Sequence, residues 1–137
     1  MEFSLSLSGR SRLWFSLRFW WTRHPMLRYQ SYARWRYPDK SLFSDTDLLI
    51  EGFGRSGSSY VGDAFRLVNG FDTKLSWNQK VAVSIAEAAQ WRVPTLVLIR
   101  EPEPVALSYR TMNPRLSFEL LLKEYVAYYK FIWRHRD

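Results

Sequence analysis

The chain of 137 residues contains no cysteine. This absence excludes a disulfide framework and any metal site that depends on thiolates. The sequence holds only two histidines, His24 and His135, and they lie near opposite ends of the chain. A histidine-based metal site needs ligands that come together in the fold, and so few histidines do not favour one. We therefore expect no metal cofactor.

The sequence also lacks long apolar runs. In the first 40 residues, Arg12, Arg18 and Arg23 interrupt every stretch that approaches the ~20 apolar residues of a transmembrane helix. The same arginines interrupt the apolar centre that a secretory signal requires. Because nothing in the sequence argues for secretion, we expect a cytoplasmic protein, with attachment to a membrane surface as an alternative.

Acidic residues are scarce in residues 1–40, where Glu2 and Asp39 stand against eight lysines and arginines. Eight minus two gives +6, which is nearly all of the formal net charge of +7. This segment is also rich in Trp, Phe and Tyr. Such a segment can pack on the domain, can contact an anionic membrane peripherally through residues 10–36, or can bind RNA by stacking. We favour packing over membrane contact, and a nucleic-acid partner least.

Composition and length indicate one globular unit. Hydrophobic residues make up 47% of the chain and aromatic residues 18%, which argues against general disorder. A chain of this length has room for one hydrophobic core. We divide it into a basic, aromatic helical extension at residues 1–44 and an α/β domain at residues 45–137.

Apolar periodicity predicts alternating strands and helices in the second part. The apolar runs at residues 48–51 and 95–99 are expected to be strands, the second of them buried. Strand–helix alternation is typical of a parallel sheet, and we expect a three-layer α/β domain of the phosphate-loop type. Helices are expected at residues 11–36 with a break at Pro25, and at 58–68, 79–91, 104–111 and from Ser117, the N-cap, onward.

Small residues and one arginine follow the first expected strand. Gly52 and Gly57 have the spacing of a phosphate-binding loop, and the hydroxyl residue Ser59 completes the pattern. Ser58 stands where an ATPase carries lysine, whereas Arg55 places a cation inside the loop. Small residues and the following helix N-terminus favour an anion here. The alternative is a Gly/Ser-rich turn without a ligand.

Arg100 ends the second expected strand, where a nucleoside triphosphatase usually has an aspartate for Mg²⁺. Arginine offers a planar fork to phosphate and does not bind metals. Ser108 follows eight residues later, about two turns into the next expected helix. Taken singly, Arg100 could pair with Glu101 or Glu103, and Ser108 could be solvated. Together, after a strand, they indicate a second anion site.

The two stretches, RSGSS at residues 55–59 and VLIREPEPVALSY at residues 97–109, resemble the sulfotransferases that use 3′-phosphoadenosine 5′-phosphosulfate (PAPS). The likeness extends from about residue 47 to about residue 109 and is greater to bacterial members than to the animal cytosolic enzymes. It implies that Arg100 and Ser108 hold the 3′-phosphate of this cofactor. It also implies that the 5′-phosphosulfate is held by Arg55, Ser56, Gly57, Ser58 and Ser59.

The resemblance implies transfer of a sulfuryl group to a hydroxyl or amine of an acceptor that the sequence does not identify. Arg55 is then the candidate to stabilise charge in the transition state. Many members carry a catalytic histidine about two dozen residues before the Arg100 position, but Asn78 lies near that place here. An amide side chain cannot take the proton from the hydroxyl or amine that receives the sulfuryl group. Asp63 and Glu51 are candidate bases, although an exposed helix charge and a strand-end charge are the favoured interpretations.

A second departure from the family concerns length. Members commonly continue with a basic, glycine-containing segment that covers the cofactor, and nothing in this sequence matches it. We therefore expect the domain to be incomplete at its C-terminus and catalysis to be impaired. The alternative function is a non-catalytic module that binds a phosphorylated nucleotide or a protein partner.

Overall fold

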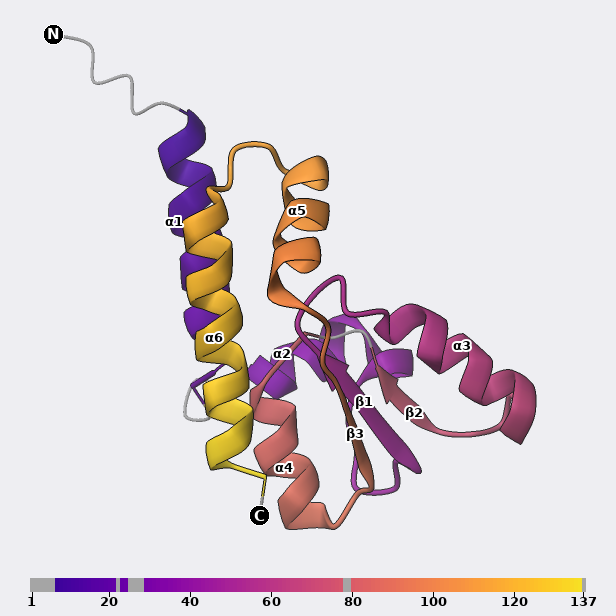
Figure 1. Ribbon diagram of the computed structural model, residues 1–137. Coiled ribbons are helices and arrows are strands. Elements are labelled where there is room, and N and C mark those ends of the chain that lie inside the picture. Colours follow the sequence, from indigo (N-terminus) through magenta and orange to yellow (C-terminus); the bar gives the residue numbers. More distant parts are fainter. Residues whose placement is uncertain (1–6, 22, 25–28, 78–79, 137) are drawn as a thin grey trace, which may run out of the picture.

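The computed structural model describes residues 7–21, 23–24, 29–77 and 80–136. It has mixed α/β architecture, with a small sheet and helices packed around it (Figure 1). In chain order the elements are α1 (Leu7–Trp21), α2 (Tyr29–Arg36), the 3-10 turn η2 (Pro38–Lys40), β1 (Leu48–Gly52), α3 (Ser58–Asn69), β2 (Leu75–Trp77), α4 (Val83–Trp91), β3 (Thr95–Leu98), α5 (Pro102–Met112) and α6 (Phe118–Arg134).

The three strands form a parallel sheet in the order β2-β1-β3. In the register of the sheet, Ile50 of β1 lies beside Trp77 of β2 and Leu96 of β3. The predicted parallel sheet is thus confirmed. Because all three strands point the same way, the loops that follow them meet at one edge of the sheet.

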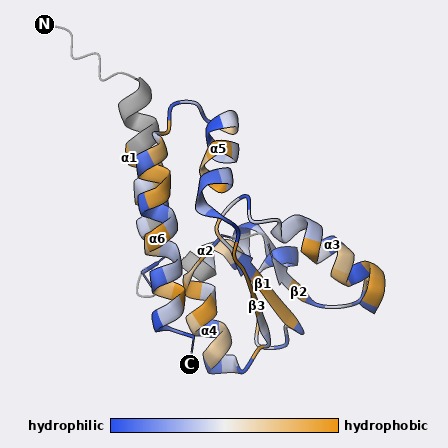
Figure 2. Ribbon diagram, viewed as in Figure 1, coloured by the Kyte–Doolittle hydropathy of each residue, from blue (hydrophilic) through white to orange (hydrophobic). Residues whose placement is uncertain are grey.

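Helices cover both faces of this sheet because the side chains of β1 alternate between them. Leu49 packs into a buried cluster with Ile85 of α4 and Tyr128 of α6. Ile50 packs on the other face with Trp77 and with Phe65 of α3. In Figure 2 the strands are coloured largely as apolar, as expected for a sheet between two layers of helices.

The N-terminal helices pack on the same unit. Helix α1 runs beside α6 (Figure 1), and Arg23, just beyond α1, forms an ion pair of 2.7 Å with buried Glu124 of α6. Phe15 of α1 contacts Tyr109 of α5 edge to face, with ring centroids 5.9 Å apart. Arg34 of α2 pairs with Glu87 of α4 at 2.7 Å. These contacts join residues on both sides of the predicted boundary at residue 44, which itself stays a prediction.

The strand predicted at residues 95–99 exists, but the prediction that it is buried is wrong. Strand β3 pairs with β1 alone in the described sheet and therefore lies at an edge. Leu96 is 40% exposed and Ile99, just after the strand, is 74% exposed. Strand β3 therefore has the apolar composition of a central strand but lies at the edge of the sheet.

Strand β2 was not predicted, because three residues are too few to show a strand period. Helix α4 begins at Val83, four residues later than predicted, since Lys80 has a φ of 57° and cannot belong to a right-handed helix. The N-cap of α6 is confirmed: the backbone N–H of Leu120 donates to Ser117 Oγ at 3.2 Å.

Candidate anion-binding site

The loop between β1 and α3 has a backbone suited to an anion. The φ angle is positive at Arg55 (71°) and at Gly57 (96°), but not at Ser56 between them. Such an alternation is typical of the concave nests that bind anions, although the N–H of Ser56 is already used within the turn. No side chain caps the N-terminus of α3 at Gly57, so the free N–H groups of its first turn add to this potential.

Positive φ at Arg55 is uncommon for a residue with a side chain and costs conformational energy. The surrounding structure holds it in place. The N–H of Ser56 donates to the Phe53 carbonyl at 3.1 Å and closes the turn. A methyl group on Gly54 would overlap the Tyr109 hydroxyl of α5. The loop is therefore fixed against α5, and only glycine fits at residue 54.

The structure brings the two sequence motifs together. Arg55 Nε donates a hydrogen bond to Ser108 Oγ at 2.9 Å. Arg100 Nη1 donates to the backbone carbonyl of Arg55 at 3.2 Å. The guanidinium groups of Arg55 and Arg100 thus lie at one exposed surface, although Arg100 follows β3 and Ser108 lies on α5. The sequence alone could not predict these contacts between the two motifs.

The remaining predicted loop residues occupy different environments. Ser58 is buried at the start of α3, whereas Ser59 is exposed. Ser56 Oγ is buried and has no hydrogen-bond partner among the described residues. A buried hydroxyl without a partner is costly, and such groups are often satisfied by a ligand or water. The roles of these three serines in binding stay a prediction.

Two tyrosines of α6 hold the strand ends beneath the loop. Tyr129 OH donates to the Leu98 carbonyl at 2.6 Å and accepts from the Phe53 N–H at 3.2 Å. Tyr125 OH donates to the Arg100 carbonyl at 2.6 Å. Burial raises the pKa of Tyr129 to about 12, so this hydroxyl remains protonated and keeps donating. The sequence showed these tyrosines as an apolar stripe, and their hydroxyl contacts were missed.

Glu51, the residue before the loop, is only 1% exposed. Its Oε1 accepts from Tyr128 OH at 2.7 Å and from the Gly52 N–H at 3.0 Å, and its Oε2 accepts from Ser84 Oγ at 3.2 Å. Burial nevertheless dominates and raises the pKa of Glu51 from near 4.5 to about 7. The carboxyl group thus joins β1 to α4 and α6 inside the core rather than facing the open side of the loop.

The other candidate base, Asp63, is exposed on α3. The structure gives it no hydrogen bond or ion pair with another described residue, and its catalytic role stays a prediction. Asn78 lies outside the described residues. Among the residues that are described, no carboxylate or imidazole forms a hydrogen bond or ion pair with Arg55, Arg100 or Ser108.

No group of three or more His, Asp or Glu side chains within the described ranges could hold a metal ion. In the same part of the chain, no helix combines the length and apolar character that crossing a membrane requires. No protein-family model, curated protein or solved structure matches the chain. Any function must therefore be argued from the residues of this site.

We expect replacement of Glu51 by Gln to change how stability depends on pH. The folded protein holds the Glu51 proton more tightly than the unfolded chain does. The contribution of Glu51 to the free energy of unfolding should therefore be fully present below pH 4.5 and be lost as pH rises through about 7. A rise in pKa from near 4.5 to about 7 corresponds to roughly 3 kcal/mol as an upper bound.

Urea unfolding of Glu51→Gln between pH 4 and 8.5 measures this effect. The variant should lack this fall and be more stable than the wild type above pH 7. Asp63→Asn, which removes an exposed carboxylate, is the control and should keep the slope of the wild type. An unchanged slope in Glu51→Gln would show that the buried carboxyl group is not the source.

Proposed function

We propose that this chain is a sulfotransferase-like protein of the phosphate-loop type that binds PAPS. The observation that carries the proposal is the contact between the two motifs, in which Arg55 donates to Ser108 at 2.9 Å and Arg100 donates to the Arg55 backbone at 3.2 Å. A ligand with anionic groups at two ends would need such adjoining cationic sites. A single phosphate would need only one of them.

The proposed assignment is compatible with the hydrogen bonds that the site already makes. Ser108 accepts a hydrogen bond from Arg55, so its own proton remains free to be donated to a phosphate oxygen. Arg100 donates one N–H to a backbone carbonyl, and the other N–H groups of its guanidinium remain for the 3′-phosphate. The nest of loop N–H groups, with Arg55, would take the 5′-phosphosulfate and stabilise charge during transfer.

Sulfuryl transfer also requires that the acceptor hydroxyl or amine lose a proton. Glu51 is buried behind the loop, and exposed Asp63 forms no hydrogen bond or ion pair with the described cationic residues of the site. This favours the second candidate function, a phosphonucleotide-binding module with little or no catalysis. Both functions share the same nucleotide site and differ only in turnover.

We expect the chain to bind adenosine 3′,5′-bisphosphate more tightly than ATP in the absence of Mg²⁺, because the paired cationic sites match phosphates at both ends of the nucleoside. In Arg100→Ala, the loss of one charge-assisted contact should cost about 1.5–3 kcal/mol, or roughly one to two decades of affinity. Titration calorimetry measures both. Arg92→Ala, an exposed arginine on the C-cap of α4, is the matched control. Equal affinity for the two nucleotides, or no loss in Arg100→Ala, would refute the 3′-phosphate assignment.

We expect slow turnover even if PAPS binds. General-base catalysis is typically worth ~10²–10⁴-fold, and no described residue of the site supplies a base. An assay of sulfate transfer to phenols, sugars and amines measures the rate, and Asn78→His should restore part of it if residue 78 faces the transferring group. Fast turnover by the unaltered chain, insensitive to changes of Asp63 or Glu51, would contradict this expectation.

We further propose that the solvent side of α1 contacts an anionic membrane surface. Leu13, Leu17 and Trp20 follow one face of the helix at spacings of four and three residues, with Trp14 beside them, and all four side chains are exposed. The strong positive charge of residues 1–40 would attract this face to anionic lipids. The nucleic-acid alternative has no comparable observation in its favour.

Trp14→Ser should weaken binding to vesicles with anionic lipid by about tenfold, because a partly inserted indole loses roughly 1.4 kcal/mol of burial. Trp133→Ser on α6 is the matched control, since Trp14 is 68% and Trp133 69% exposed. Vesicle co-sedimentation at several salt concentrations measures both. Deletion of residues 1–36 is a poor test, because Ala33 is buried in the core. Equal losses in the two variants, or equal binding to neutral vesicles, would contradict the proposal.

A further inference from the structure

Two further cations lie near the candidate anion site, Lys80 and Arg18. Lys80 follows β2, so it lies at the same edge of the sheet as the loop after β1 and as Arg100 after β3. Burial lowers the pKa of Lys80, and the positive charges of Arg18 and Arg55 lower it further. The charges of Arg18 and Arg55 thus act on the same ammonium group.

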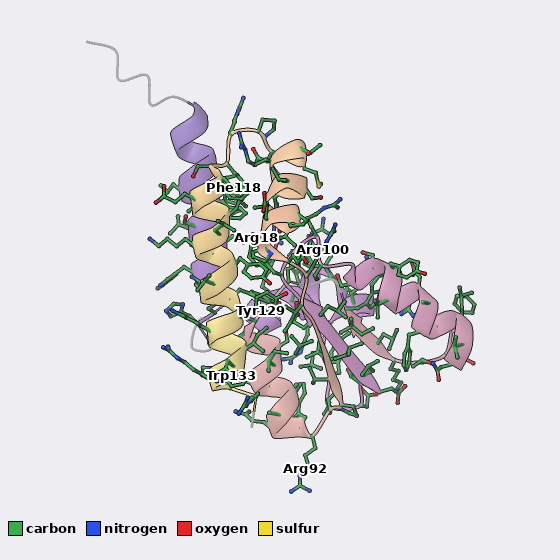
Figure 3. The ribbon with its side chains drawn as sticks, viewed as in Figure 1. Arg18, Arg92, Arg100, Phe118, Tyr129 and Trp133 are labelled. Carbon is green, nitrogen blue, oxygen red and sulfur yellow. The ribbon has the colours of Figure 1, made fainter. Side chains whose placement is uncertain are left out.

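Contacts of Tyr109 place α1 in the same region, because Phe15, three residues before Arg18 on that helix, contacts the Tyr109 ring with centroids 5.9 Å apart. Burial dominates and raises the pKa of the Tyr109 hydroxyl, while the charges of Arg18 and Arg55 act on it in the opposite direction. Tyr109 is the residue that lies against Gly54 of the loop. In Figure 3, Arg18 and Arg100 lie in the same part of the molecule, whereas Arg92 points away from it at the far end.

Within the described ranges, none of the four cations Arg18, Arg55, Lys80 and Arg100 forms an ion pair with a carboxylate. Other arginines of the N-terminal region do so: Arg23 and Arg34 each have a glutamate at 2.7 Å. The nearby carboxyl group of Glu51 is committed to hydrogen bonds in the core. The buried carboxyl group of Glu51 acts on Lys80 with the opposite sign, but it forms no ion pair with any of the four cations. Neighbouring cations repel one another, and an anionic ligand would reduce that repulsion.

We infer that Arg18 and Lys80 bind the ligand of this site, and that helix α1 is thereby part of the binding site rather than an appendage. Because Arg100 and Ser108 are assigned to the 3′-phosphate, Arg18 and Lys80 would hold the phosphosulfate end beside Arg55. The identity of the ligand rests on the proposed function, whereas its polyanionic character rests on the four cations alone.

Arg18→Gln and Lys80→Gln test the inference, with Arg92→Gln as a control that removes the same charge far from the site. The probes are adenosine 3′,5′-bisphosphate and inorganic pyrophosphate, titrated by calorimetry. Each site variant should bind both probes about tenfold more weakly, since each loses one charge-assisted contact at a partly solvated position. The control should bind them like the wild type.

The two probes separate this inference from the proposed function. If the wild type binds pyrophosphate as tightly as the nucleotide, and Arg18→Gln weakens both, the polyanion site stands and the nucleotide assignment fails. If the wild type prefers the nucleotide and Arg18→Gln binds like Arg92→Gln, the inference fails and the proposed function stands. If the wild type binds neither probe, both fail.

Two further measurements cover loss of folding in the variants. Without ligand, Arg18→Gln should melt at the temperature of the wild type or above it, because the substitution relieves repulsion; a lower melting temperature that accounts for the weaker binding would indicate a structural role. Arg18→Lys, which keeps the charge, should retain binding within about threefold.

The assignment of Lys80 has a separate test in the wild type. Saturating nucleotide should protect Lys80 from amine acetylation, as read by mass spectrometry, and absence of protection would overturn its assignment.

Discussion

The hydrogen bonds of a single hydroxyl group, that of Tyr129, tie together the parts of the molecule that make the site. It donates to the last carbonyl of β3 and accepts from the first N–H of the loop after β1, so two strand ends are joined by a side chain from α6. Tyr125, one turn earlier, adds the same support to Arg100. Since α6 also packs against α1, the position of the N-terminal helix is coupled to the geometry of the loop.

Charge is distributed unevenly across this framework. The core side of the loop holds a buried carboxyl group, Glu51, which burial keeps partly protonated near neutral pH. The open side holds cations that form no ion pair with a described carboxylate. A negative charge buried beneath the loop would oppose an anion above it, so a raised pKa at Glu51 serves an anion site as well as the core. Burial in the core and binding of the proposed anion thus both favour the neutral, protonated form of Glu51.

Local sequence signals were sufficient for most individual elements. Ser117 was recognisable as an N-cap, and the helix after Gly57 followed from its apolar spacing. Local sequence signals failed where the structure of an element depends on its contacts with the rest of the fold. Strand β3 has the composition of a buried strand and lies at an edge, because edge or centre depends on which other strands pair with it. The late start of α4 follows from the left-handed conformation of Lys80, which no propensity indicates.

The amino-acid sequence alone shows which chemical groups are available to the site: small residues and an arginine after one strand, an arginine after another, and a serine two turns into a helix. These features are local, because turn conformation and helix spacing depend on neighbouring residues. Three further facts exist only in the folded chain: Arg55 contacts Ser108, Glu51 is buried, and Phe15 of α1 contacts Tyr109 beside the loop. Those facts depend on how strands pair and helices pack, which bring together residues that are distant in the chain.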